Sequence, residues 1–320
     1  MPETIHVNVD NFARAETDRM FYDLQRDAGG VNTFMHNREP TPVVSNVQTV
    51  IRLNRDTLYS FAVVDISAGA TLHLPAADGD RYISAMIVNE DHYVNKIYHE
   101  AGACELTIGC FETEYVVVAV RILVDPNDPG DVEQVVKLQN QLRIEAGSTR
   151  PFPQPEHVEA SRKETSDALL VLAKGLSEFD KTFGKKADVD QVRHLIGTAA
   201  GWGGLPSEEA YYVGVDPRLP VGFYELTVGD VPVEAFWSIS VYNAEGYFEP
   251  NDAGVYSVNS VTGIRDSDGS ITVRFGEDRG LPNTIPTPEG WNYLVRLYRP
   301  GPEILDGSWT FPTLDEKSGR

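Results

Sequence analysis

The chain of 320 residues has few cysteines and few basic residues. Its two cysteines, Cys104 and Cys110, allow a hairpin disulfide but are more typical of two reduced, buried thiols. Lysine and arginine number 27 against 48 acidic residues, which gives a net charge of −21. Because nucleic acids and anionic membranes bind clustered basic residues, this composition argues against both as partners and favours neutral or cationic ligands.

Long hydrophobic runs are also missing. No apolar run reaches the roughly 18 residues that a membrane-spanning helix needs. Residues 1–6 contain neither a basic region nor an apolar stretch, so no signal peptide is predicted. We therefore expect a cytoplasmic protein, or a secreted one if a leader precedes this sequence.

Familiar catalytic and cofactor motifs are absent as well. The sequence has no Gly-x-Ser-x-Gly, P-loop, His-Glu-x-x-His or Cys-x-x-Cys motif. The segment Gly201-Trp202-Gly203-Gly204 looks nucleotide-like, but Pro206 stands where a dinucleotide fingerprint has its third glycine. His92 and His99 would face opposite sides of one strand, so a metal site would need a bend between them. We expect neither a cofactor nor a metal.

Strand patterns dominate the first part of the chain. After an amphipathic helix predicted over 11–28, short β-branched and aromatic runs alternate with turn residues. The predicted strands include 57–66, 70–74, 81–88 and 115–124. This pattern predicts an N-terminal antiparallel β domain with a leading helix over residues 1–126.

Helical patterns follow, and strand patterns then return. Capping-box spacings predict three helix starts, at Asp131, Ser161 and Asp188. We therefore expect a helical connector over residues 127–210 and a second antiparallel β domain over 211–320, where 266–269 is a hairpin signal. The predicted fold class is α+β, mostly β, with two antiparallel β modules joined by a central helical segment.

A weak internal similarity links the two β regions. Residues 84–89 with Tyr93 match residues 238–243 with Tyr247 in register. Each match is followed by a tyrosine-led strand that ends in arginine, at Arg121 and at Arg299. The similarity fits either a coincidence of strand and turn composition or a duplication. Duplication would make the molecule two related β modules joined by helices.

Polar chemistry is concentrated where the first long strand begins, at Asn54, Arg55, Asp56 and Tyr59. In one interpretation, Asn54 and Asp56 accept hydrogen bonds from backbone amides and staple a turn. In the other, Asp56 or Tyr59 lies in a partly dry cleft and Arg55 sets the local charge. The two interpretations are compatible, because a stapled turn also fixes a functional side chain.

Four further residues are candidates for a site. His194 lies beside an apolar helix face, which is typical of a structural histidine. Trp202, among glycines, is either a pocket wall or a packing anchor, and Trp237 is a strand aromatic that belongs to a core by default. Arg296 interrupts an apolar strand, so it points into a cavity or pairs with an acid.

Taken together, these motifs resemble a bacterial family that joins two domains of unknown function, numbered 1254 and 1214. The resemblance covers residues 45–312 and is carried by segments 54–60, 81–84, 91–93, 193–198, 201–206, 236–238, 246–248, 268–270 and 305–309. It implies a two-part architecture with a jelly-roll-like C-terminal domain. It carries over no established reaction, although some labels in the family suggest hydrolysis.

The leading functional hypothesis is a metal-independent enzyme, a hydrolase, lyase or isomerase. It would act on a small, largely apolar organic molecule in a cleft between the β modules. Asp56 would be the acid or base, Tyr59 would orient the substrate, and Arg55 or Arg296 would stabilise negative charge. The remaining predicted ligand contacts are Asn54, His194, Trp202 and Trp237.

Two other hypotheses stay open. The alternative is a non-catalytic carbohydrate- or metabolite-binding protein, and the third is a structural or assembly role in which the motifs serve only the fold. The expected partner is a small-molecule ligand, and the sequence leaves a homo-oligomer open.

Overall fold

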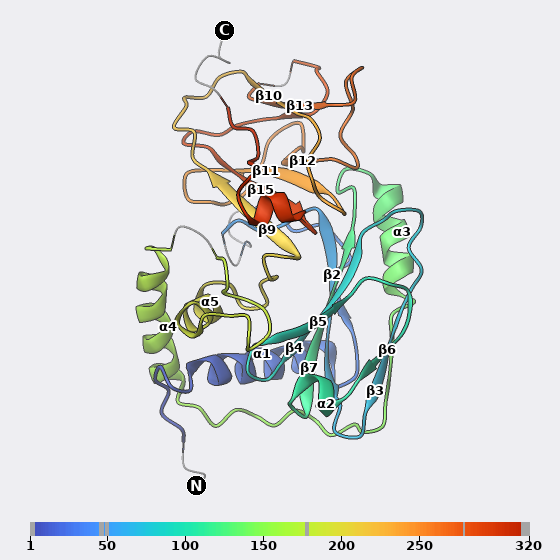
Figure 1. Ribbon diagram of the computed structural model, residues 1–320, viewed down its shortest axis with the longest axis vertical. Coiled ribbons are helices and arrows are strands. Elements are labelled where there is room, and N and C mark those ends of the chain that lie inside the picture. Colours follow the sequence, from blue (N-terminus) through green and yellow to red (C-terminus); the bar gives the residue numbers. More distant parts are fainter. Residues whose placement is uncertain (1–3, 45–47, 49–50, 177–178, 278, 315–320) are drawn as a thin grey trace. The chain divides into compact units, whose positions relative to one another are not determined.

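The computed structural model describes residues 4–44, 48, 51–176, 179–277 and 279–314 (Figure 1). The chain divides into two compact units, and each is assembled from segments that are distant in sequence. Unit 1 comprises Met1–Arg38, Leu58–Leu123 and Glu133–Ser207. Unit 2 comprises Glu39–Thr57, Val124–Val132 and Glu208–Arg320. The sequence predicts three consecutive segments instead, because composition does not reveal a chain that leaves a unit and returns to it.

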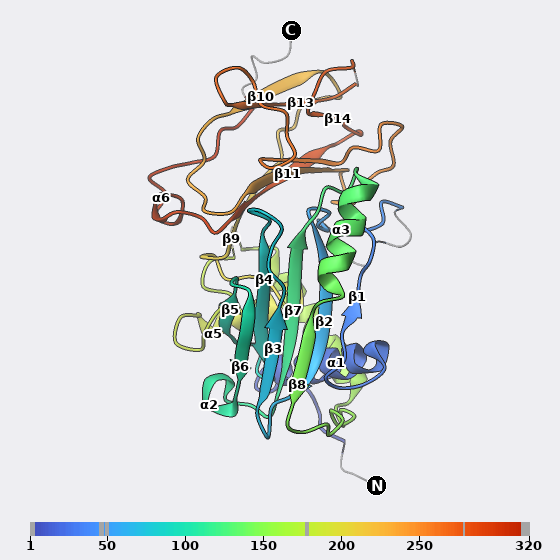
Figure 2. The same ribbon diagram turned by 90° about the vertical axis from the view of Figure 1, so that its right-hand side faces the viewer.

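Unit 1 contains two sheets and a group of helices. The larger sheet has the order β1-β2-β7-β4-β5 and the smaller one β6-β3-β8. Figure 2 shows the smaller sheet lying over one face of the larger sheet. The strands are β1 Met35–His36, β2 Thr57–Asp65, β3 Ala70–Leu74, β4 Ile83–Asn89, β5 Val94–Tyr98, β6 Gly102–Leu106, β7 Tyr115–Leu123 and β8 Arg143–Ala146. The predicted N-terminal strands are therefore present within one or two residues of their expected bounds.

Helices of unit 1 pack against each other through an apolar cluster that includes Phe12, Leu169 and Ile196. The helices of the chain are α1 Phe12–Ala28, α2 Ile108–Phe111, α3 Pro129–Gln139, α4 Glu159–Ala173, α5 Gln191–Gly201 and α6 Pro302–Leu305. Helix α1 ends at Gly29, whose φ of 79° gives the left-handed cap that glycine adopts without strain.

The predicted helix caps are wrong in detail. Asp190, and not Asp188, caps α5, because its side chain accepts hydrogen bonds from the backbone amides of Val192 and Arg193. The hydroxyl of Ser161 donates to the carbonyl of Val158 and accepts from the amide of Val7, so it ties the N-terminal segment to α4.

Unit 2 is built from a four-stranded sheet, β12-β11-β15-β9, and a three-stranded sheet, β10-β13-β14. Side chains of both sheets form one core, with Trp291, Tyr293 and Phe275 among its largest members. The strands are β9 Ala210–Val215, β10 Tyr224–Val228, β11 Trp237–Tyr242, β12 Ser257–Asn259, β13 Ile271–Phe275, β14 Thr284–Ile285 and β15 Asn292–Tyr298. The hairpin predicted at 266–269 is wrong, because β12 pairs with β11 whereas β13 pairs with β10.

The two units share one strand topology. The larger sheet of unit 1 contains the strand order β2-β7-β4-β5, and the four-stranded sheet of unit 2 has the order β9-β15-β11-β12 reading from its other edge. Counted along the chain, the strands of each unit thus follow the same spatial order. The second sheet repeats too, because β3 pairs with β6 and β10 pairs with β13, both antiparallel. This agreement in two sheets favours duplication over coincidence as the origin of the internal similarity.

The turns that follow β4 and β11 are the same in detail. The side-chain oxygen of Asn89 accepts from the amides of the residues two and four positions later, and that of Asn243 does the same. At the third position after each asparagine the backbone is left-handed, with φ of 65° at His92 and 90° at Gly246. Residue n of this segment in unit 1 therefore corresponds to residue n + 154 in unit 2.

The neighbouring strand fixes a second correspondence. Ser84 lies opposite Arg121 in the β4–β7 pair, and Ser238 lies opposite Arg296 in the β11–β15 pair. Arg121 therefore corresponds to Arg296, and the sequence-based match of Arg121 with Arg299 is wrong by three residues.

A tyrosine completes the same row in both units. The amide of Val124 donates to the carbonyl of Asp56, and the amide of Ile66 donates to the carbonyl of Glu114. These two hydrogen bonds make β2 and β7 antiparallel. Their register places Tyr59 opposite Arg121. Tyr212 lies opposite Arg296 in the β9–β15 pair. Each larger sheet thus carries a Tyr–Arg–Ser row across three adjacent strands.

The predicted fold class, α+β and mostly β, is confirmed. None of the described helices has the length and apolar composition required to cross a bilayer. Both cysteines are free; Cys104 is buried as expected, whereas Cys110 is exposed.

Candidate functional site

Asp56 is fully buried in unit 2. Its Oδ2 accepts a hydrogen bond from the Ser238 hydroxyl at 2.6 Å, and its backbone amide donates to Asn54 Oδ1 at 2.9 Å. Burial raises the pKa of the Asp56 carboxyl, and the positive charge of Arg296 opposes that rise only in part. The stapled turn expected from the sequence is present, and the carboxyl points inward.

Arg296 lies in the same buried network. Its guanidinium donates to Ser240 Oγ and Tyr242 Oη, each at 2.9 Å, and to the carbonyls of Arg52 and Leu53 at 2.8 and 3.1 Å. Burial lowers the pKa of Arg296, but neighbouring phenols and a carboxylate raise it above its ordinary value. The guanidinium therefore holds the segment before β2 against the sheet of unit 2.

The other predicted residues of unit 2 also make protein contacts. Asn54 Nδ2 donates to Thr57 Oγ1 and to Tyr298 Oη, each at 3.1 Å. The Arg55 guanidinium lies 5.2 Å from the centre of the Tyr256 ring, and burial lowers its pKa. Trp237 is a core residue of unit 2.

Tyr59, Trp202 and His194 belong to unit 1. The guanidinium of Arg121 lies 5.4 Å from the centre of the Tyr59 ring and donates to the carbonyl of Gly203 at 3.0 Å. Trp202 stacks on His92 at a ring separation of 5.3 Å. The structure thus divides the predicted site residues between two sets of contacts, one in each unit.

His92 connects the central motifs of unit 1 through hydrogen bonds. Its Nε2 accepts from the Gly203 amide at 2.9 Å, and its Nδ1 lies 2.8 Å from Thr198 Oγ1. Because that hydroxyl donates to the His194 carbonyl, Nδ1 carries the proton and the ring is neutral. Burial lowers the pKa of His92 well below its ordinary value, and His194 packs on Tyr93 at 4.6 Å. Among the described residues no group of three or more His, Cys, Asp or Glu side chains has the geometry to hold a metal.

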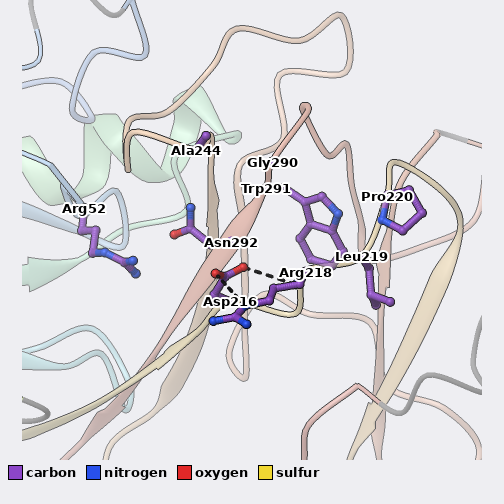
Figure 3. Close-up of a pocket in the computed structure, with 9 residues that line it drawn as sticks. All are labelled: Arg52, Asp216, Arg218, Leu219, Pro220, Ala244, Gly290, Trp291 and Asn292. Carbon is purple, nitrogen blue, oxygen red and sulfur yellow. Dashed lines mark hydrogen bonds and ion pairs between the residues drawn. The ribbon is translucent and has the colours of Figure 1, made fainter.

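A pocket of about 640 Å³ lies in unit 2, at the end of the four-stranded sheet where β15 begins (Figure 3). Its lining comes from the segment before β2, the chain after β9, the turn after β11 and residues 290–292, where β15 begins. The lining includes Arg52, Asp216, Arg218, Ala244, Gly290, Trp291 and Asn292.

Three buried polar atoms of this pocket have no hydrogen-bond partner among the residues that the structure describes. They are Arg52 Nη1, Trp291 Nε1 and Asn292 Oδ1. Trp291 is 1% exposed and Asn292 6%, so bulk water does not hydrate these two side chains freely. Asn292 Nδ2 donates to the Asn243 carbonyl at 2.6 Å, which fixes the amide and leaves its oxygen for another donor. Three residues of the pocket lining thus each carry a buried polar atom without a partner among the described residues, two of them donors and one an acceptor.

The charge of this pocket differs from that of the whole chain. Arg52 and Arg218 supply two positive charges, and Asp216 supplies one negative charge. Asp216 lies 3.7 Å from Arg218 at the exposed side, whereas Figure 3 shows the Arg52 guanidinium pointing toward Asn292 and Asp216. A local excess of positive charge in a protein of net charge −21 attracts a group that carries negative charge.

The sequence identifies none of these pocket residues. Arg52 lies two residues before the predicted polar cluster, and Trp291 and Asn292 precede a strand that reads as ordinary core. One signal was present, because an asparagine directly before a tyrosine-led apolar strand is an uncommon choice for a buried position.

Comparisons with known proteins identify the domains. The chain matches two family models, each described as a protein of unknown function. DUF1254 matches residues 31–103 and DUF1214 matches residues 220–302, as the motifs predicted. No curated protein matches the chain. The solved structure of the VPA0106 protein from Vibrio parahaemolyticus is similar, with a TM-score of 0.73 and 17% identity over 96% of this chain and 97% of that one. An uncharacterised protein from Burkholderia cenocepacia has a TM-score of 0.50 and 13% identity over 92% and 84%. These similarities show the fold.

Proposed function

For a chain that joins the domains of unknown function DUF1254 and DUF1214, we propose that the function is to bind a small metabolite in the pocket of unit 2. The observation that carries the proposal is that three residues lining one pocket each have a buried polar atom without a partner among the described residues: Arg52 Nη1, Trp291 Nε1 and Asn292 Oδ1. A buried polar group without a partner costs about 1–3 kcal/mol. A ligand that supplies the three partners removes that cost, which favours recognition at this place.

The lining of the pocket supports binding more than chemistry. The described lining contains no histidine, cysteine, serine or lysine, and the one carboxylate of that lining, Asp216, is exposed and lies beside Arg218. Proton transfer needs a group whose pKa lies near the working pH and which touches the substrate. The pocket offers fixed hydrogen-bond donors and acceptors instead, which are the means of orienting a ligand.

Acid–base catalysis by Asp56 is the second candidate. The observation that favours it is a buried carboxyl with a raised pKa beside the Ser238 hydroxyl, since enzymes tune general acids in this way. Asp56→Asn separates the two candidates. Binding by the pocket predicts that this variant retains ligand affinity, whereas catalysis predicts that turnover of the bound molecule is lost.

Binding is tested with a panel of sugars, amino acids and small organic acids, by thermal shift and then by isothermal titration calorimetry. The variants are Arg52→Met, which removes the unpartnered donor, and Trp291→Phe, which removes the indole N–H and keeps the apolar ring. The exposed Arg143→Met in unit 1 is the matched control.

We expect at least one member of the panel to bind the unaltered protein and Arg143→Met equally, and to bind both pocket variants more weakly. The proposal is contradicted if no member of the panel binds, or if neither pocket substitution changes the affinity of the ligand that binds.

A further inference from the structure

The duplication allows the pocket of unit 2 to be compared with the same place in unit 1. In the turn that follows β4, Glu90 corresponds to Ala244 of unit 2, which lies 154 positions later in the chain. Counting back six residues from the paired arginines, Arg121 and Arg296, gives Tyr115 and Gly290. Ala244 and Gly290 line the pocket of unit 2, and Glu90 and Tyr115 line a pocket of about 490 Å³ in unit 1. The two pockets therefore occupy equivalent positions in the two modules.

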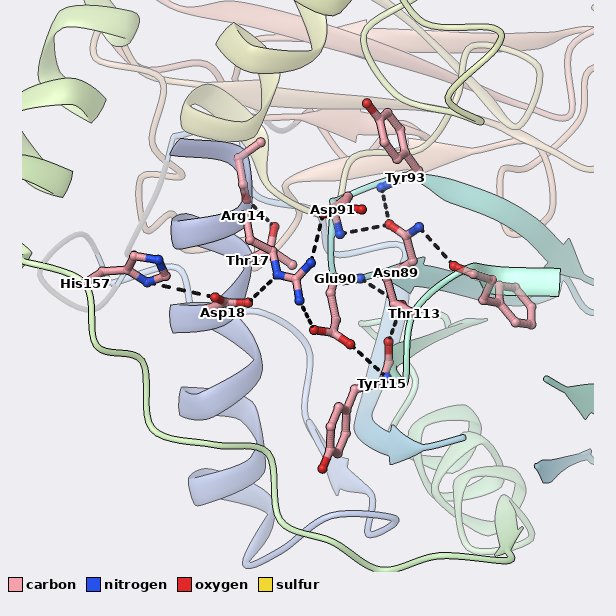
Figure 4. A network of polar contacts seen from close by, with 12 residues as sticks. Arg14, Thr17, Asp18, Asn89, Glu90, Asp91, Tyr93, Thr113, Tyr115 and His157 are labelled. Atoms are coloured by element: carbon pink, nitrogen blue, oxygen red, sulfur yellow. Dashed lines mark hydrogen bonds and ion pairs between the residues drawn. The ribbon is translucent and has the colours of Figure 1, made fainter. Parts of the chain in front are cut away.

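In unit 1 the chain itself supplies a carboxylate at this position (Figure 4). Glu90 is 6% exposed; its Oε1 accepts from the Tyr115 amide at 3.0 Å, and its Oε2 accepts from Nη2 of Arg14. A carboxylate is thus held between an arginine and the backbone amide at the start of β7, the usual geometry of a charge-assisted pair.

In unit 2 the corresponding carboxylate is missing. Ala244 replaces Glu90 and has an exposed side chain, so its methyl group neither fills the pocket nor carries a charge. Arg52 Nη1 has no hydrogen-bond partner among the described residues. By the register of the paired strands, the amide of Gly290 is the counterpart of the Tyr115 amide, which binds Glu90. The arginine and the amide are therefore in place, and their anion has to come from outside the chain.

We propose that the pocket of unit 2 binds a small organic carboxylate that carries a hydroxyl or ammonium group beside the carboxylate. The carboxylate contacts Arg52 and the Gly290 amide, and the second group donates to Asn292 Oδ1 and faces Asp216. The carboxylate of Asp216 disfavours a dianion such as phosphate, because like charges at short range repel. This inference rests on the proposed function, whose ligand class it names.

The test uses four probes on the full chain by titration calorimetry. Lactate carries both groups, propionate lacks the hydroxyl, 1,2-propanediol lacks the carboxylate, and inorganic phosphate is an anion of different shape. We expect lactate to bind best and propionate next. We expect Arg52→Met to weaken lactate binding by roughly tenfold or more, as the loss of one charge-assisted hydrogen bond implies.

Ala244→Glu is the decisive variant, and Ala244→Gln is its matched control of the same size without charge. Glutamate at 244 reproduces Glu90, so we expect it to abolish lactate binding and raise the unfolding temperature above that of Ala244→Gln. The glutamine variant should keep measurable lactate affinity.

The outcomes separate the two proposals. Equal binding of lactate and 1,2-propanediol, or stronger binding of phosphate, overturns the carboxylate inference and leaves the binding function standing. If none of these probes and no member of the wider panel binds, the proposed function fails as well. Identical stability of the glutamate and glutamine variants overturns the equivalence of Glu90 and Ala244, on which the inference depends.

Discussion

Arg121 lies directly opposite Ser84, and Arg296 holds the same position relative to Ser238 in the second unit. Both arginines are buried, and both donate to backbone carbonyls of a non-strand segment of their own unit. Arg121 binds the carbonyl of Gly203, and Arg296 binds those of residues 52 and 53. The repeated arginine thus fixes the chain that covers each sheet.

Removing the Arg296 side chain should therefore destabilise unit 2 strongly. Arg296→Met leaves two carbonyls, two hydroxyls and the buried Asp56 without their cation, and we expect a loss of about 3–5 kcal/mol in the free energy of unfolding. Arg296→Lys should recover only part of the lost stability. The ammonium restores the positive charge but cannot reproduce the forked geometry of the guanidinium. Urea unfolding measures both variants, and a loss under about 1 kcal/mol, as expected for the exposed Arg143→Met, would contradict this role.

Asp65 should make the protein sensitive to acid. Burial alone would raise its pKa, but hydrogen bonds from Arg150, Ser148 and Ser67 outweigh burial and hold the pKa well below its ordinary value. The folded state therefore binds this proton less readily than the unfolded state, whose Asp pKa is about 3.9. The stabilisation is fully present above about pH 4 and is lost as pH falls further.

Asp65→Asn should flatten that part of the stability profile. The free energy of unfolding of both proteins is measured by urea titration between about pH 3 and pH 7, a range that spans the ordinary Asp pKa. We expect the two curves to converge toward low pH. Parallel curves would show that Asp65 titrates alike in both states.

His92 should add a second acid-sensitive step at higher pH. Its folded pKa is depressed by burial and, less strongly, by the charge of His194, so the unfolded state takes up the proton first. Stability is therefore present above about pH 6.5 and declines below it. His92→Gln should lack this step, and an NMR titration that shows the His92 ring protonating near its ordinary pKa in the folded protein would refute the prediction.

Glu90→Ala should remove the carboxylate that the chain supplies to the pocket of unit 1. The variant leaves Nη2 of Arg14 and the Tyr115 amide without their acceptor, while Arg14 keeps its ion pairs with Asp18 and Asp91. Because Arg14 is also 43% exposed, we expect a loss of about 1–3 kcal/mol in the free energy of unfolding. Added acetate should restore part of the lost unfolding temperature by occupying the vacated place. The same concentration of acetate on the unaltered protein is the control, and an equal shift in both would argue against the equivalence of the two pockets.

Local features of this fold could be predicted from sequence, and long-range ones could not. Residues 70–74 form β3 where predicted, because alternation of buried and exposed side chains is a property of neighbouring residues. Asp188 and Asp190 both precede α5, and spacing alone did not show which of them caps it. The Arg121–Arg299 match failed because a tyrosine-led strand pattern does not fix register, which depends on hydrogen bonds between strands.

The candidate site shows the same division. The turn at Asn54 and Asp56 was predictable, because both members lie within three residues. The pocket was not, because Arg52 and Trp291 meet only through the fold of unit 2 and neither belongs to a motif. The ionisation of Asp56 was not predictable either, because it depends on burial and on Arg296, 240 positions later.

The indole N–H of Trp291 gives the most direct measurement of the proposed binding. The chain has four tryptophans, whose indole groups give separate signals in a ¹⁵N–¹H correlation spectrum, and Trp291→Phe assigns one of them. We predict that titration with the ligand moves the Trp291 signal progressively and leaves those of Trp202, Trp237 and Trp309 in place. A ligand that saturates the protein while the Trp291 signal stays where it was would contradict binding in this pocket.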